Sequence, residues 1–331
     1  MAWKGWKKDE QMTLSEAMAQ AKAELTPFWH GSPPLLIGLN VNGKSQIFPL
    51  EEAFKKQNWL IYLLDATDFS GRGMLVYARE FHKRYGNLGL NSMAVFRSGY
   101  SYFKNKKVIE GLLKRQEISF PVAVDPDSNV FAGFGVEIAP KVILMEHGTP
   151  VIEQAGEKWI EGFELSVQAF LRKTDPGLPL FPPFSAGGLK KDISRFDLNK
   201  KALPGIPKGL VKVTGKWSLE DDRAKTADSK ATLAFTSTAE DVTIIVQTEA
   251  QSPVENSKII IEINGAPSRQ TYAAKDLIFD EDGHSCFRPE IARLYHVLEG
   301  MQKGHKEITL RFPNAERIPV GIFGMRFSEK F

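Results

Sequence analysis

The sequence predicts two regions of different class, an α/β region followed by an all-β region. Between residues 35 and 172, apolar runs typical of strands alternate with stretches whose apolar residues recur at helical spacing. Beyond residue 210 no long helical stripe occurs, and short strand-like runs are separated by turn residues. We therefore predict an N-terminal helical extension over 1–32, an α/β domain over 33–174, a linker rich in proline, glycine and lysine over 175–209, and an all-β domain over 210–331.

The expected elements of the α/β domain follow a capped helix. Thr13 and Glu16 form a capping box ahead of that helix, and Asn42-Gly43 lies between two apolar runs, a strong hairpin signal. Residues 59–64 form an apolar run without alternation, which predicts a strand buried on both faces. The remaining elements are a helix from about 74 to 85, a strand over 90–96, a helix near 108–113, a strand over 121–124, a hairpin over 141–154 and a helix over 159–172. This order predicts a mixed sheet covered by helices.

The second domain contains a series of short strand-like runs, which predict a β-sandwich or jelly roll. Asn264-Gly265 and Asp282-Gly283 are turn dipeptides between such runs. The expected strands cover 230–236, 241–248, 258–263, 307–312 and 320–327.

Composition and charge exclude several classes of function. With 42% hydrophobic residues the chain can build a core, and its net charge of +3, spread over both signs, is not that of a nucleic-acid-binding protein. A single cysteine excludes an intrachain disulfide and a dithiol catalyst. No apolar run is long enough to span a membrane. Met1–Glu10 lacks the apolar stretch of a signal peptide, which favours the cytoplasm, although a removed leader would leave the same pattern.

The sequence contains no motif for metal, phosphate or acyl chemistry. Its six histidines lack metal-ligand spacing, so we predict no metal site and no cofactor. The acidic turn Asp280–Asp282 offers three carboxylates, fewer than the oxygen ligands that calcium takes, and is more typical of a solvated turn. Gly43-Lys44-Ser45 lacks the upstream glycine of a phosphate-binding loop, and no Gly-x-Ser-x-Gly elbow occurs.

The α/β domain resembles the TlpA/redoxin type of thioredoxin-like domain over Leu35–Arg172. The resemblance rests on the hairpin Asn42–Leu50, the strand end Ala66-Thr67, the strand Ile118–Val122 with Asp125, and the loop Gly135–Pro140 followed by a hairpin through His147-Gly148. It implies an α/β thioredoxin-like fold, a mixed sheet flanked by helices, with a cis-proline loop at Pro140.

The domain departs from this family at the residues that carry its chemistry. The family has Trp-Cys-x-x-Cys after Ala-Thr, whereas here Phe69 and Arg72 occupy the two cysteine positions. In a peroxiredoxin register, Ser70 would take the cysteine position. Neither register supplies a thiolate for thiol–disulfide exchange. Cys286 lies in the other domain, where a free cysteine is typical of a small buried hydrophobe. We therefore predict no catalytic residue and a redox-inactive domain.

The loops around the former redox centre could still bind a partner. In this fold the loop before the helix and the cis-proline loop pair with an extended peptide by strand addition, and the helix start offers N–H groups to an anion. The alternative is a spacer whose loops contact nothing. The candidate peptide-contact residues are Asp68, Phe69, Ser70, Gly71, Arg72, Ala139 and Pro140.

The second domain resembles the C-terminal jelly-roll module of DipZ-type proteins, which is itself similar to carbohydrate-binding modules. The resemblance rests on Gly215-Lys216-Trp217, Ala231–Val246, Ala292–Leu298 and Glu307–Phe312. It implies a glycan partner held by aromatic stacking and by charged groups, and a location outside the cytoplasm. The candidates are Trp217, Phe287, Arg288, Arg293 and Tyr295. For the aromatic candidates the competing role is core packing, and for the arginines it is a salt bridge or a solvated surface.

Two functions from different classes follow. The first is a non-enzymatic binding or scaffolding protein, whose β domain binds glycan or protein. The second is a thiol–disulfide oxidoreductase or peroxiredoxin-like antioxidant activity inherited from the family, which would need Cys286 or a partner's cysteine. A purely structural interdomain unit is a third possibility.

Overall fold

The computed structural model describes most of the chain beyond residue 34 and divides it into two compact units. The described residues are 35–39, 45–49, 54–97, 100–125, 128–137, 139–156, 160–179, 181–184, 190–199, 209–248, 257–267, 274–289, 291–301 and 304–330. The expected helix of the N-terminal extension and the Asn42-Gly43 turn lie outside these residues. Unit 1 comprises Met1–Leu64, Met74–Arg97 and Ile118–Ala186, and unit 2 comprises Asp65–Gly73, Ser98–Glu117 and Gly187–Phe331.

Unit 1 is built on the mixed sheet that the sequence predicts. The seven strands follow the order β2-β1-β5-β4-β3-β6-β7, in which β4 and β5 run parallel and the hairpins β1–β2 and β6–β7 are antiparallel. The strands are β1 (Leu35–Leu39), β2 (Ser45–Pro49), β3 (Asn58–Asp65), β4 (Leu90–Arg97), β5 (Val122–Val124), β6 (Lys141–Glu146) and β7 (Thr149–Ala155).

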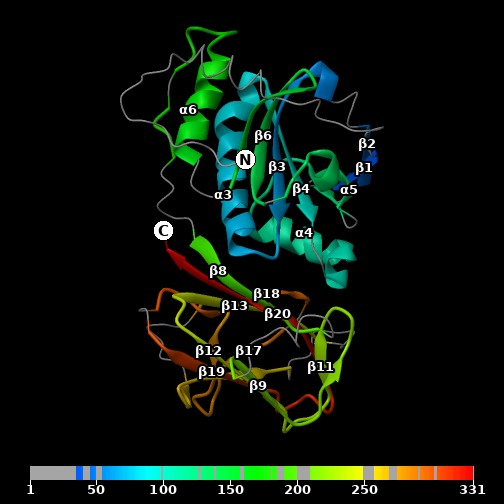
Figure 1. Ribbon diagram of the computed structural model, residues 1–331, viewed down its shortest axis with the longest axis vertical. Helices are drawn as coiled ribbons and strands as arrows, with labels where there is room; N and C mark the ends of the chain where they lie inside the picture. Colours follow the sequence, from blue (N-terminus) through cyan, green and yellow to red (C-terminus); the bar gives the residue numbers. More distant parts are fainter. Residues whose placement is uncertain are drawn as a thin grey trace. The chain divides into compact units, whose positions relative to one another are not determined.

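Helices accompany this sheet, as Figure 1 shows for α3 and α6. The helices of the first half of the chain are α3 (Phe69–Tyr85), α4 (Lys106–Arg115), α5 (Asn129–Gly133) and α6 (Ile160–Leu171), with short 3₁₀ turns η1 (Gly86–Leu88) and η2 (Ser101–Lys104). Phe81 of α3 packs on Phe163 of α6, with ring centroids 6.1 Å apart. Helix α5 was not predicted. It is capped by Asp125, whose carboxylate accepts hydrogen bonds from the backbone of Val130 and Phe131.

Strand β3 is buried on both faces, as its unbroken apolar run predicts. Trp59, Ile61 and Leu63 belong to a core cluster that includes residues of α5. On the opposite face Tyr62 packs against Phe120. Because successive side chains of a strand point to opposite faces, a strand covered on both sides needs apolar residues at every position.

A buried carboxylate secures the proline-rich stretch after α6. Glu164 is fully buried and accepts hydrogen bonds from Arg84 at 2.7 Å, from the Tyr85 hydroxyl at 2.6 Å and from the Phe184 backbone at 2.6 Å. The guanidinium of Arg84 also lies 3.4 Å from the centroid of the Phe184 ring. These three donors stabilise the negative charge of the Glu164 carboxylate in the interior.

The β-rich part of unit 2 consists of two antiparallel sheets. One follows the order β10-β11-β20-β13-β18 with β8 paired to β20, and the other follows β16-β17-β14-β19-β12-β9 with β15 paired to β14. The strands are β8 (Lys190–Asp197), β9 (Val211–Thr214), β10 (Ser218–Leu219), β11 (Ala224–Thr226), β12 (Thr232–Ser237), β13 (Asp241–Thr248), β14 (Ile259–Ile263), β15 (Ala266–Pro267), β16 (Ile278–Phe279), β17 (Ser285–Phe287), β18 (Arg293–Leu298), β19 (Lys306–Arg311) and β20 (Val320–Lys330).

The two sheets share one hydrophobic core, the arrangement of a β-sandwich. Leu233 and Phe235 alternate with half-buried residues along β12, and they pack in one cluster with Ile244 of β13 and Met325 of β20. This confirms the expected all-β class, and the five predicted strands correspond to β12, β13, β14, β19 and β20.

Strand β8 lies in the segment that the sequence predicts as part of the linker. Its residues, Lys-Lys-Asp-Ile-Ser-Arg-Phe-Asp, show little apolar periodicity. The strand instead forms by pairing with β20, in a register that places Arg195 opposite Arg326 and Asp197 opposite Gly324. Because the partner strand β20 lies more than a hundred residues away, the residues of β8 by themselves do not predict this pairing.

No helix among the described residues is long and apolar enough to cross a membrane.

Candidate functional site

The start of α3 holds the residues at which the family resemblance places the redox centre. Ahead of the helix, the Asp65 carboxylate accepts hydrogen bonds from the Thr67 backbone, at 2.9 Å, and from its hydroxyl. The Asp68 backbone N–H donates to the Asp65 carbonyl. Gly71 lies so close to this turn that a Cβ at Gly71 would be 2.0 Å from the Asp65 carbonyl oxygen. The close approach of helix and turn therefore requires glycine at this position.

The side chains at the family's cysteine positions pack within unit 2. Phe69 is 6% exposed, and its ring meets that of His296 edge-on at 6.0 Å. Ser70, at the position a peroxiredoxin register would give to cysteine, is buried. Arg72 lines a cavity with two other arginines, described below. None of these side chains can form a thiolate, so the start of α3 offers no sulfur nucleophile.

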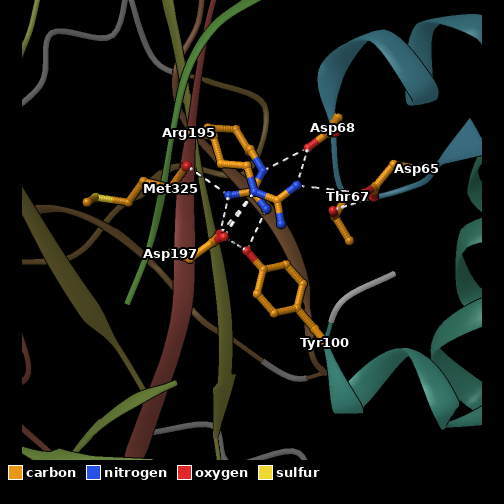
Figure 2. A network of polar contacts seen from close by, with 8 residues as sticks. Asp65, Thr67, Asp68, Tyr100, Arg195, Asp197 and Met325 are labelled. Atoms are coloured by element: carbon orange, nitrogen blue, oxygen red, sulfur yellow. Dashed lines mark hydrogen bonds and ion pairs between the residues drawn. The ribbon is translucent and has the colours of Figure 1, made fainter. Parts of the chain in front are cut away.

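Asp68 belongs to a polar network around a fully buried arginine, which Figure 2 shows. Arg326 of β20 is 0% exposed and donates from Nε to Asp68 at 2.9 Å, from Nη1 to Asp197 at 3.1 Å and from Nη1 to the Met325 carbonyl at 3.0 Å. Its Nη2 donates to the Tyr100 hydroxyl oxygen, and that hydroxyl in turn donates to Asp197. Every arm of the guanidinium is thus engaged.

A second arginine belongs to the same network. Arg195 of β8 donates to Asp197 at 3.1 Å and lies 3.8 Å from both Asp65 and Asp68. Burial by itself would raise the pKa of Asp197, but Arg326, the Tyr100 hydroxyl and Arg195 lower it below its usual value. Two arginines therefore face three carboxylates. These contacts can stabilise unit 2. The network contains no nucleophile and no carboxylate without a partner.

The other half of the predicted peptide-contact edge lies in unit 1. The Ala139–Pro140 peptide is cis, as the resemblance implies, and the Pro140 carbonyl accepts a hydrogen bond from Gly156 at 2.8 Å. Asp68–Arg72, the other part of the prediction, belongs to unit 2. Peptide binding there stays a prediction.

The glycan candidates of the β domain differ in their exposure. Phe287 and Tyr295 are 0% and 1% exposed and stack on each other with ring centroids 5.0 Å apart, so both contribute to the core and neither presents a ring face to solvent. Trp217 is half-buried against Phe312, and its indole N–H donates to the Thr214 carbonyl. Arg288 is exposed. Phe287 and Tyr295 therefore have the role that competes with glycan binding for aromatic residues in strands, which is packing in the core.

Arg293, the fifth glycan candidate, lies at the cavity that Arg72 lines. Its guanidinium pairs with Asp276 at 2.9 Å, donates to the Leu294 carbonyl at 2.9 Å and lies 3.8 Å from the centroid of the Tyr295 ring. Arg115 of α4 is the third arginine at this cavity. The structure therefore brings together Arg72 and Arg293, which the sequence analysis assigned to different sites.

Cys286 is buried in strand β17. It is 0% exposed, and burial raises the pKa of its thiol, with the negative charge of Asp280 acting in the same direction. Both effects disfavour the thiolate, which is the reactive form of cysteine.

The acidic turn at Asp280 gathers three groups capable of binding a metal. Ligand atoms of Asp280, Asp282 and His284 lie within 4.8 Å of one another. However, the Asp280 carboxylate already accepts a hydrogen bond from Lys258 Nζ at 2.5 Å and others from the backbone of Asp282 and His284. The lysine ammonium neutralises the carboxylate that a cation would need, so the turn is stabilised by its own residues.

Sequence reasoning missed Arg326, Tyr100, Asp197 and Arg115. One signal was available, because Arg326 interrupts the apolar run of β20, and an arginine in a buried strand requires charged or polar partners. The partners themselves could not be named, since Asp68 lies 258 residues away in the chain and Asp197 lies 129 residues away.

Comparisons with known proteins find similarity of structure but none of sequence. No protein family and no curated protein matches the chain. A solved thioredoxin-like protein in its oxidised form is 20% identical, with 45% of this chain and 99% of that chain covered and a TM-score of 0.38. The mitochondrial 2-Cys peroxiredoxin of Plasmodium falciparum is 9% identical over 47% of this chain and 100% of its own, with a TM-score of 0.37. A family two carbohydrate esterase from Cellvibrio japonicus is 10% identical over 42% of this chain and 34% of its own, with a TM-score of 0.31.

Proposed function

We propose that this chain is a redox-inactive thioredoxin-like protein that works as a binding or scaffolding module. The observation that carries the proposal is the identity and packing of the residues at the two cysteine positions. Phe69 is packed on His296, and Arg72 lines a cavity, where an oxidoreductase of this fold would have thiols. A helix start can lower the pKa of a thiol, but it cannot turn a phenyl ring or a guanidinium into a nucleophile.

The other route to sulfur chemistry is Cys286, and its surroundings oppose it. The thiol is buried and its pKa is raised, whereas reactive cysteines are partly exposed and lie in electropositive surroundings. A catalytic cycle also needs a second thiol to resolve the mixed disulfide, and with one cysteine in the sequence another molecule would have to supply it. Inherited oxidoreductase or peroxidase activity is therefore the less supported function.

The binding role is divided between the two regions in this proposal. The cis-proline loop at Pro140 and the loop before α3 would offer an edge to an extended peptide, by the strand addition typical of this fold. The β-rich region would act as a jelly-roll module of the DipZ type that binds a glycan or a protein. Among its candidates, Trp217 and Arg288 retain exposed surface for such a contact.

The test measures redox turnover and ligand binding with the full chain. We expect no reduction of insulin with dithiothreitol and no hydroperoxide turnover above background, for the wild type and for Cys286→Ser alike. An active thioredoxin serves as the positive control. Turnover by the wild type that disappears in Cys286→Ser would refute the proposal and establish the oxidoreductase.

The binding arm uses glycan and peptide arrays probed with the same preparation. We expect saturable binding to one class, weakened in Trp217→Ala or Arg288→Ala if the β-rich region is responsible. Circular dichroism of each variant verifies that it is folded. If neither array binds while the protein is folded, the binding role is wrong.

A further inference from the structure

A small cavity in unit 2, with about 20 Å³ of free space, is lined by three arginines. Arg72 comes from the start of α3, Arg115 from the last turn of α4 and Arg293 from the start of β18. The free space is room for about one water-sized group, well below the roughly 300–1,000 Å³ of a site that encloses a whole small molecule. The cavity therefore suits a single functional group, with the rest of any ligand lying outside it.

The positive charge at this cavity exceeds the negative charge among the described residues. Asp276 pairs with Arg293 through one carboxylate oxygen, at 2.9 Å, and accepts the His296 backbone N–H with the other, at 2.7 Å. Within the part of the chain that the structure describes, the guanidinium groups of Arg72 and Arg115 form no ion pair and no hydrogen bond with a side chain. Arg72 is half-buried and Arg115 is exposed, and a guanidinium group that loses hydration, as that of Arg72 does, is normally paired.

The pKa values of Arg72 and Arg115 are both lowered. The pKa of Arg72 is lowered to about 10, first by burial and then by the positive charge of Arg115. The pKa of Arg115 is also lowered, by burial and then by the charge of Arg293. Asp276 opposes both shifts but does not cancel them. An anion in the cavity would reverse these shifts, since it stabilises the charged form of each guanidinium.

A polar group on the aromatic wall also lacks a partner. Tyr102 lines the cavity and is 6% exposed, and among the described residues its buried hydroxyl has no hydrogen-bond partner. Its ring is fixed by contacts with Tyr100 and Phe323, at centroid distances of 5.9 and 4.9 Å. A buried hydroxyl without a partner is costly. The rest of the wall is apolar, formed by Val108, Leu112 and Leu294 among others.

We propose that this cavity binds a small oxyanion, a phosphate or carboxylate group, through Arg72 and Arg115, with Arg293 completing the positive wall. Guanidinium groups suit this task because their planar N–H groups match pairs of oxyanion oxygens. The apolar wall contacts a short hydrocarbon body attached to this group. The site goes beyond the proposed function and does not depend on redox inactivity or on peptide or glycan binding.

The test is isothermal titration calorimetry of the full chain with inorganic phosphate and with phenyl phosphate, at low ionic strength. We expect saturable binding of one ligand per chain, weakened by sodium chloride because the attraction is electrostatic. Phenyl phosphate should bind more tightly than inorganic phosphate, since its ring can contact the apolar wall. Phenol, which has the ring but no oxyanion, should not bind.

The variants Arg72→Gln and Arg115→Gln remove one guanidinium each, and Arg311→Gln is the matched control. Arg311 of strand β19 pairs with Glu262 of β14 and does not line the cavity, and its replacement removes one positive charge as the cavity variants do. We expect each cavity variant to weaken phosphate binding by roughly tenfold or more and the control variant to change it little. Removing a cation that lacks an ion pair should not unfold the protein, and two independent variants protect the test against a folding defect in one.

Three results would overturn the proposal. The first is the absence of saturable binding of both phosphates by the folded wild type. The second is an equal loss of affinity in Arg311→Gln, which would indicate general charge attraction. The third is binding of phenol as tight as that of phenyl phosphate, which would identify an apolar cavity in place of an oxyanion site.

Discussion

Replacing Arg326 by methionine tests whether the buried network stabilises unit 2. Arg326→Met keeps much of the length and apolar volume of the side chain but removes the guanidinium. Asp68 and Asp197, whose side chains are each 24% exposed, would lose the donor that lies between them. Tyr100 would lose its hydrogen bond from Arg326, and Arg195 would be left to balance three carboxylates.

The expected cost follows from the burial of the pair. Removing one partner of a buried ion pair costs about 3–5 kcal/mol, because the other charge remains without compensation. Partial exposure of the two aspartates places the effect toward the lower end of this range. The matched control is Arg311→Met, which breaks the pair with Glu262 at a side chain that is 51% exposed. An exposed pair of this kind contributes about 0–1 kcal/mol.

The assay is urea denaturation of the full chain at pH 7, followed by far-UV circular dichroism and by tryptophan fluorescence. Of the six tryptophans, five belong to unit 1 and Trp217 to unit 2, so fluorescence follows the unfolding of both units. We expect a clearly lower midpoint in Arg326→Met than in Arg311→Met. If the two variants lose the same small amount, the network does not stabilise the unit and the reasoning is refuted.

The pH dependence gives an independent measure of the same network. The pKa of Asp197 is lowered in the folded state, so its contribution to stability is present above its unfolded pKa of about 4 and is lost as the pH falls through the folded value. The wild type should therefore lose stability on acidification. Arg326→Met should lose less, because the group that lowered the pKa is gone. The stability difference between the two proteins should narrow toward pH 3.

Two further predictions concern the packing of unit 2. Gly71→Ala should destabilise the folded state by about 1–3 kcal/mol, because its Cβ would meet the Asp65 carbonyl, whereas Gly162→Ala, in helix α6 with nothing within 4 Å, should be neutral or stabilise it slightly. Equal urea midpoints for the two glycine variants would contradict the close approach. The Cys286 thiol should react with a disulfide reagent such as Ellman's far more slowly in the native protein than in urea, because it is buried and its pKa is raised. Equally fast native labelling would refute the burial.

Much of the fold could be predicted from the sequence because local patterns of apolar residues indicate its strands and helices. The unbroken apolar run at 59–64 became a strand buried on both faces, and the apolar stripe ahead of Gly86 became helix α3. The helix begins at Phe69, five residues earlier than the stripe indicates. Its first turn packs within unit 2 and does not continue the stripe of unit 1. Strand β8 was missed for a related reason, since its pairing with β20 stabilises residues of low β propensity.

The candidate site was also predictable only in part, because residue identities are given by the sequence whereas packing depends on residues far apart in the chain. The sequence by itself determined that no thiol stands at the start of α3, because residue identity settles that question, and it located the cis-proline loop at Pro140. It could not decide whether Phe287 and Tyr295 face a ligand or the core, since both roles use the same residue types in strands.

Tertiary structure alone decided where the charged side chains find, or fail to find, their partners. Arg326 is neutralised by Asp68, which lies 258 residues away, and Arg72 comes to lie beside Arg115 and Arg293 at one cavity. Electrostatic interactions depend on distance in space and on burial, and neither is recorded in the spacing of charges along the chain. The sequence therefore specifies the elements and the missing thiols, whereas the folded chain determines which arginines are paired and which are left to attract an anion.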